Sequence, residues 1–195
     1  MATYPIRIVG DPVLRKQAVE VTDITSDLVD LVDDMFVAMY AAPGIGLAAP
    51  QVGVQSRFFV YDLEDDPQVL INPVITASDG EWWFEEGCLS VPGQSFEICR
   101  PKQIEVSGID LDGNEVVFEA DELLARLVQH ELDHLNGVLL IDLVEPEVAQ
   151  AAKKAVREMQ MGRAGMELGG PDGRASDDRA VDEPGPRRRF GLFTK

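Results

Sequence analysis

Apolar side chains recur with a helical period in two segments of the chain. In residues 26–39 they follow an i, i+3, i+4, i+7 spacing, which places them on one face of a helix. These side chains are Leu28, Leu31, Val32, Met35, Phe36 and Met39. Ser26 is predicted to cap this helix, because its hydroxyl can accept a hydrogen bond from a free N–H of the first turn. A second helix is predicted over residues 122–136, with Gly137 as its C-terminal stop.

The segment between these helices has the pattern of short strands. Strands are predicted at residues 57–63, 69–75, 104–109 and 115–118, and Asp112-Gly113 predicts a hairpin turn between the last two. A third helical segment follows Pro146. We therefore predict an α+β fold, with small antiparallel or mixed β-sheets packed around the 122–136 helix and with a C-terminal helix.

The composition changes beyond about residue 162. Between Gly169 and Arg189 the only large apolar side chain is that of Val181. Such a segment cannot bury enough apolar surface to offset the entropy of ordering it. We predict one catalytic domain over residues 1–161 and a flexible tail over residues 162–195.

The charge balance and the N-terminus narrow the function classes. The 195 residues include 17 basic and 35 acidic side chains, for a net charge of −18. This acidity argues against a DNA-binding protein, which needs net positive charge to meet phosphates. The uncharged stretch Met35–Ser56 is broken by prolines and glycines, so we reject a membrane span. The first ten residues lack an apolar run of signal-peptide length, and a cytoplasmic location is expected.

The only two histidines, His130 and His134, are four residues apart and have Glu131 between them. On a helix, residues i and i+4 share one face, so both imidazoles can reach one metal ion. A single histidine on an apolar face is usually a core residue, but this spacing defines the zincin-type motif. Glu131 lies on the adjacent row of the helix, near the ion and free to act as a base.

The helical wheel predicts which way these histidines point. Leu123 and Leu127 precede them in one row, which is predicted to face the interior. The opposite row is polar, and it comprises Glu122, Arg126, Gln129, Asp133 and Asn136.

A catalytic metal site holds three protein ligands and leaves one position open. Cys88, in Glu86-Gly87-Cys88-Leu89-Ser90, is the stronger candidate for the third ligand, because a thiolate binds divalent ions tightly. A buried core cysteine is the alternative interpretation of Cys88. Cys99 is expected to be a small buried hydrophobe, since a disulfide is improbable in a reducing cytosol.

The segment Gly44–Gln51 is rich in small residues. Two glycines and two alanines allow its backbone to approach a ligand closely, and Gln51 offers an amide donor in an apolar neighbourhood. It lacks the Gly-Lys-Ser/Thr ending of a phosphate loop. A tight loop packed against the core is the alternative interpretation.

Together, three segments of this chain resemble the peptide deformylases. That family is marked by Gly-x-Gly-x-Ala-Ala-x-Gln, Glu-Gly-Cys-Leu-Ser and Gln-His-Glu-x-Asp-His-x-x-Gly, which stand here at Gly44–Gln51, Glu86–Ser90 and Gln129–Gly137. The resemblance covers about residues 5–160. It is specific, because three separate motifs all match the family pattern. It implies a metallohydrolase that removes the formyl group from N-formylmethionyl ends of newly synthesised polypeptides and releases formate.

The resemblance also implies roles for individual residues. One divalent ion, Fe²⁺ in the cell with Zn²⁺, Ni²⁺ or Co²⁺ as replacements, would be held by Cys88, His130 and His134. Glu131 would be the general base and acid. The oxyanion would be met by the Gln51 side-chain amide and the Leu89 backbone N–H.

Substrate and partner contacts follow from the same resemblance. The segment of Gly44, Ile45, Gly46 and Leu47 would bind the peptide as an added strand, with Ile45 in the wall of a methionine pocket. The C-terminal helix carries Lys153, Lys154 and Arg157, and with it we expect a contact to the ribosome.

Two other functions use the same residues. A zinc peptidase of different specificity would need a third ligand other than Cys88. A structural zinc module would instead close a four-ligand site from Cys88, Cys99, His130 and His134. The structural module leaves Glu131 and Gln51 without a role.

Overall fold

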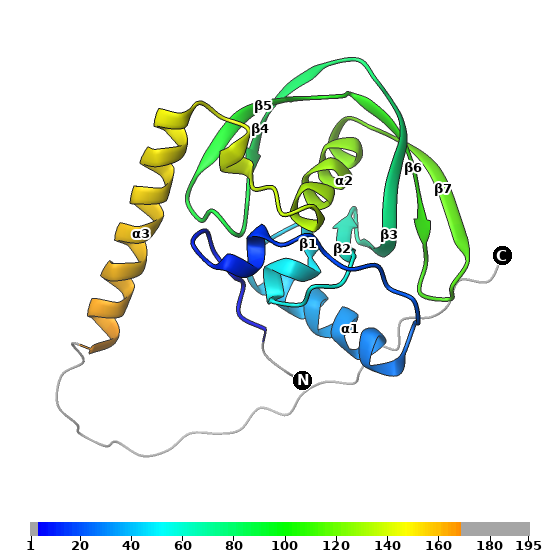
Figure 1. The fold of residues 1–195 in the computed structure, drawn as a ribbon, viewed down its shortest axis with the longest axis horizontal. Coiled ribbons are helices and arrows are strands. Elements are labelled where there is room, and N and C mark those ends of the chain that lie inside the picture. Colours follow the sequence, from blue (N-terminus) through cyan, green and yellow to red (C-terminus); the bar gives the residue numbers. More distant parts are fainter. Residues whose placement is uncertain (1–3, 169–195) are drawn as a thin grey trace.

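The computed structural model describes residues 4–168 (Figure 1). The helices are α1 (Ser26–Ala41), α2 (Glu122–Leu135) and α3 (Pro146–Leu168), with single 3-10 turns at Pro12–Arg15, Ala49–Val52 and Leu140–Asp142. The strands are β1 (Gly46–Ala48), β2 (Phe58–Leu63), β3 (Asp66–Asp79), β4 (Trp82–Gly87), β5 (Ser95–Arg100), β6 (Gln103–Ile109) and β7 (Glu115–Asp121).

Two antiparallel sheets surround α2. One has five strands in the order β1-β2-β3-β6-β7, and the other is the pair β4-β5. Figure 1 shows α2 at the centre of the molecule, with α3 along the outside. The arrangement confirms the predicted α+β fold around the helix that carries both histidines. It also confirms the predicted hairpin, in which Ile109 pairs with Glu115 and Gly113 takes a φ of +83°.

The face of α2 that packs on the large sheet is apolar. Ala125, Val128 and Leu135 are fully buried there, against Phe59 and Val106 of the sheet. Helix α2 ends one residue before Asn136, and Gly137 follows with a φ of +75°, as predicted for a stop.

The predicted inward-facing row of α2 is wrong at Leu123, and two side chains of the polar row are buried. Arg126 and Gln129 are only 3% and 8% exposed, whereas Leu123 is 43% exposed. The reason is that partners cover this part of the helix. Gln129 donates to the carbonyls of Pro101 and Ala125, and Arg126 contacts the β4–β5 pair.

Helix α1 confirms its predicted apolar face but not its predicted cap. Leu28, Val32, Met35 and Met39 are buried. The cap is Thr25, whose hydroxyl accepts from the backbone N–H of Leu28 at 3.3 Å. Thr25 has the extended backbone that a cap requires, while the helix already includes the predicted cap, Ser26.

Helix α3 passes through the predicted domain boundary at residue 161 and continues to Leu168. The rest of the predicted tail, residues 169–195, lies outside the described residues. None of the helices within residues 4–168 combines the length and apolar character needed to span a membrane.

Gly137 gives a test of the packing at the end of α2. A Cβ at this position would lie 2.9 Å from the backbone of Arg15, and the φ of +75° disfavours any other residue. We expect Gly137→Ala to lower the free energy of unfolding by about 1–3 kcal/mol in urea denaturation. Gly162→Ala in α3 is the matched control, because its Cβ would meet no atom within 4 Å. A Gly137→Ala protein as stable as the control would contradict this account.

Candidate metal centre

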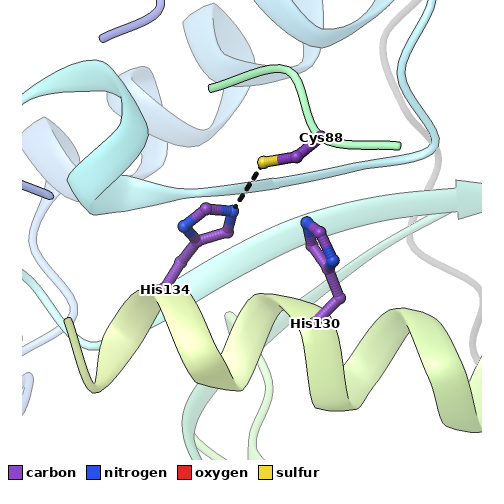
Figure 2. Close-up of side chains that lie close together, drawn as sticks. All are labelled: Cys88, His130 and His134. Atoms are coloured by element: carbon purple, nitrogen blue, oxygen red, sulfur yellow. Dashed lines mark hydrogen bonds between the residues drawn. The ribbon is translucent and has the colours of Figure 1, made fainter. Parts of the chain in front are cut away.

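Three predicted ligands converge at the carboxyl end of β4. Cys88 directly follows that strand, and His130 and His134 project toward it from successive turns of α2 (Figure 2). The Cys88 Sγ lies 3.2 Å from the Nε2 of His134. One ligand atom from each of the three residues lies within 4.8 Å of the others.

These donors fit a transition-metal ion. A thiolate with two imidazoles suits Zn²⁺ or Fe²⁺ better than Mg²⁺ or Ca²⁺, which prefer oxygen. The Nδ1 of His134 and one carboxylate oxygen of Glu131 are buried without a hydrogen-bond partner in the described residues. Burial alone would raise the pKa of the Cys88 thiol, but the adjacent His134 and His130 outweigh burial and lower it. The low pKa favours the thiolate, which is the metal-binding form.

The carboxylate of Glu86 positions His130. The Nδ1 of His130 donates to Glu86 at 3.0 Å, which leaves the Nε2 free for an ion. Arg100 donates to the same carboxylate through two nitrogens, at 2.6 and 3.0 Å, and Arg126 donates to it as well. Burial opposes ionisation of Glu86, but the hydrogen bonds from His130 and Arg100 outweigh burial and lower its pKa to about 2.

The two arginines also join the small sheet to α2. Arg100 on β5 donates to Asp133 at 2.8 Å, and Asp133 directly precedes His134 on α2. Arg126 donates to the carbonyl of Ile98 at 3.1 Å and lies 4.8 Å from the centre of the Trp82 ring. Roles for Glu86, Arg100 and Arg126 are not predicted from the sequence. The one available signal was that Glu86 stands two residues before Cys88 in the same motif.

Glu131 points at the glycine-rich segment. It is 4% exposed, and a Cβ on Gly46 would lie 2.5 Å from its Oε1. Only glycine therefore lets this segment pass so close to the carboxylate. Burial raises the pKa of Glu131, although the charges of His130 and His134 oppose the rise.

Gln51 is buried with a fixed orientation. Its Oε1 accepts from the backbone N–H of Ala48 at 2.7 Å, so its amide nitrogen faces the opposite way. That nitrogen lies 3.2 Å from the Oγ of Ser90 and 4.0 Å from the Sγ of Cys88. Ser90 in turn donates its hydroxyl hydrogen to the carbonyl of Arg7 at 2.8 Å. Ser90 belongs to the motif Glu86–Ser90 around Cys88, but no role is predicted for it from the sequence.

The predicted substrate-binding segment lies beside a large cavity. Gly44, Ile45 and Gly46 line a cavity of about 1010 Å³, together with Leu89 and the site residues Gln51, Cys88, His130 and Glu131. The Leu47 side chain is instead fully buried in the core. Within the described residues, strand β1 is the edge strand of the large sheet, and the backbone N–H of its last residue, Ala48, is bound by Gln51.

Cys99 lies away from this centre. It pairs with Trp83 in the β4–β5 sheet and is half-buried, rather than buried as expected. Its neighbours Ile98 and Arg100 are buried, and alternation along a strand places Cys99 on the other face. Within residues 4–168 the candidate metal cluster consists of Cys88, His130 and His134. This geometry argues against the four-ligand structural module.

The sequence is similar to many known enzymes. Residues 3–150 match the family model described as polypeptide deformylase. A peptide deformylase of Acidothermus cellulolyticus is 47% identical over 160 residues, which cover 82% of this chain and 89% of the relative. A peptide deformylase of Agathobacter rectalis is 50% identical over 145 residues, covering 74% of this chain and 92% of the relative.

Solved structures agree with this similarity. The crystal structure of a peptide deformylase from Legionella pneumophila has a TM-score of 0.81 and 38% identity, and the match covers 84% of this chain and 98% of that one. The enzyme of Ehrlichia chaffeensis in complex with actinonin has a TM-score of 0.79 and 37% identity, and the match covers 82% and 98% of the two chains. The chain described here belongs to the polypeptide deformylase family.

Proposed function

We propose that this chain removes the formyl group from N-formylmethionyl ends of newly synthesised polypeptides and releases formate. The observation that carries the proposal is the cluster of Cys88, His130 and His134, of which Cys88 and His130 line a cavity, in a chain of the deformylase family. The family assignment favours this reaction over a peptidase of different specificity. We place the reaction in the cytoplasm, where new polypeptides are made.

Cys88, His130 and His134 are the proposed ligands of one divalent ion. Fe²⁺ is the proposed ion in the cell, and Zn²⁺, Ni²⁺ and Co²⁺ are the proposed replacements, since the same donor set suits all four. When bound, such an ion would polarise the formyl oxygen and lower the pKa of a bound water toward 7.

Glu131 is the proposed general base and acid. It would accept a proton from the attacking water and deliver it to the departing amine. Its carboxylate is buried beside both histidines and has an oxygen without a partner in the described residues, so it is available for this transfer.

Gln51 and Leu89 are the proposed donors to the developing oxyanion. The hydrogen bond from Ala48 fixes the Gln51 side chain with its amide nitrogen on the side of Cys88. The backbone N–H of Leu89 follows Cys88 directly in the chain. Donors fixed in advance stabilise charge without reorganising during the reaction.

The glycine-rich segment is proposed to select the substrate. The free edge of Gly44–Leu47 would pair with the peptide backbone as an added strand. Ile45, Phe84 and Leu123 line the same cavity and offer apolar surface for a methionine side chain. The close approach of Gly46 to Glu131 restricts the space beside the proposed base, which would favour a small acyl group such as formyl.

Helix α3 is the proposed contact to the ribosome. Lys153, Lys154 and Arg157 are exposed on it, and cations favour contact with RNA phosphates.

The base is tested with Glu131→Gln. We expect formate release from formyl-Met-Ala-Ser to fall at least about 100-fold in anaerobically purified, iron-loaded protein, because the proton acceptor is lost while the ligands remain. Metal content should be unchanged. Glu122→Gln, an exposed carboxylate at the start of α2, is the control and should keep full activity. Unchanged activity of Glu131→Gln would refute its role, and a metal-loaded wild type that releases no formate would refute the reaction.

The Ser90 contact is tested with a double-mutant cycle. Ser90→Ala frees the Gln51 amide, so we expect kcat to fall several-fold with KM and metal content nearly constant. Gln51→Ala should cost about 100-fold or more. The double variant should be no slower than Gln51→Ala alone, because Ser90 acts through Gln51. Additive losses in kcat would mean that Ser90 acts independently of Gln51. Ser78→Ala, at an exposed position on β3, is the control.

The ribosome contact is tested by charge reversal on α3. The variant Lys153→Glu/Lys154→Glu/Arg157→Glu should lose co-sedimentation with ribosomes at low ionic strength, because three cations become anions. Formate release from a neutral tripeptide serves as the folding control. Co-sedimentation equal to that of the wild type would rule out this contact.

A further inference from the structure

A second cavity lies between the N-terminal segment and α3. Its volume is about 870 Å³, and it is lined by residues of the segment from Pro5 to Pro12, by Arg15, and by Lys153, Arg157 and Gln160 of α3. We call it the basic groove, because four cationic side chains line it: Arg7, Arg15, Lys153 and Arg157. Neither the reaction chemistry nor the methionine pocket uses it, and two of its cations, Lys153 and Arg157, also belong to the proposed ribosome contact.

The basic groove adjoins the substrate cavity. Ile6, Ile8 and Gln160 line both. The chain between the two isoleucines also contacts the catalytic centre, because the backbone N–H of Arg7 donates to the carbonyl of Gln51 at 2.7 Å. A polypeptide that leaves the substrate cavity past these shared residues therefore enters the groove.

The charge in the groove is opposite to that of the whole chain. Lys153 and Arg157 stand four residues apart on one face of α3. Lys153 lies close enough to Asp142 to help lower the pKa of that carboxyl, whereas Arg157 forms no salt bridge within residues 4–168. Arg7 lies 3.7 Å from Asp11, and Arg15 is paired with Asp142. Four cations thus face two nearby carboxylates, which leaves the groove with a net positive charge in a chain whose net charge is −18.

We propose that the basic groove holds the part of the substrate polypeptide downstream of the formylmethionine and favours acidic side chains there. This inference rests on the proposed deformylase function. An extended chain advances up to about 3.3–3.6 Å per residue, so a few residues carry the peptide out of the first cavity. There, Lys153 and Arg157 would form charge-assisted hydrogen bonds with the carboxylates of acidic side chains of the peptide. The global charge of −18 would by itself favour basic peptides, so a preference for acidic ones is diagnostic of the groove.

Three formylated peptides test the proposal: formyl-Met-Ala-Ser followed by three Asp, three Ser or three Lys. The expected kcat/KM of the wild type is about fivefold higher for the Asp peptide than for the Lys peptide at low ionic strength. The difference should lie in KM, because the contacts are remote from the reacting bond. It should shrink at about 0.5 M salt, where exposed charges are screened.

Two double variants, which change the net charge by the same amount, distinguish the effect of the groove from the effect of the global charge. Lys153→Glu/Arg157→Glu should abolish or reverse the preference for the Asp peptide. Lys16→Glu/Lys154→Glu should retain it, because these two exposed lysines lie outside the groove. The kcat/KM of each variant for the Ser peptide is the reference against which its values for the Asp and Lys peptides are compared.

Other outcomes overturn the proposal. A wild type that prefers the Lys peptide, or equal loss of preference in both double variants, would show that only global charge acts. Binding of an oligoribonucleotide that is lost in Lys153→Glu/Arg157→Glu, without discrimination among the peptides, would assign the groove to phosphates instead. Failure to release formate even from the Ser peptide would refute the proposed function itself and is distinguishable from these results.

Discussion

The buried Glu86 carboxylate is the interaction on which the site depends. A buried charge is tolerated only when it is paired and hydrogen-bonded, and Glu86 meets Arg100, Arg126 and His130. The arginines come from β5 and α2, so they hold the small sheet against the helix. Because Cys88 follows Glu86 by two residues, the contacts that orient His130 also place the thiol beside the histidines.

Close backbone approach is the second constraint, and it shapes the cavity. A Cβ on Gly46 would lie 2.5 Å from a Glu131 oxygen, and one on Gly44 would lie 2.7 Å from the Leu89 side chain. The glycine-rich segment thus lies in close contact with the side chains of both Glu131 and Leu89. These contacts restrict the space beside the proposed base.

Much of this arrangement is predictable from sequence, because its causes are local. The spacing of His130 and His134 determines that both imidazoles share one face of α2, and the apolar period of α1 predicts its buried side. The burial of Arg126 is not predictable in this way, since its cause is a strand pair from a distant part of the chain. The link between Gln51 and Ser90 escapes prediction for the same reason: it joins residues 39 positions apart. The periodicity of a sequence predicts which residues share one face of a helix or strand. Only the tertiary structure shows which other elements cover that face.

The ligand set around the metal is the central claim, and X-ray absorption spectroscopy of the iron-loaded protein tests it most directly. The account predicts one sulfur and two imidazole nitrogens, with the remaining coordination supplied by solvent oxygen. A second sulfur would bring Cys99 into the site and contradict the separation of β5 from the metal ligands. A spectrum without sulfur would contradict the role of Cys88.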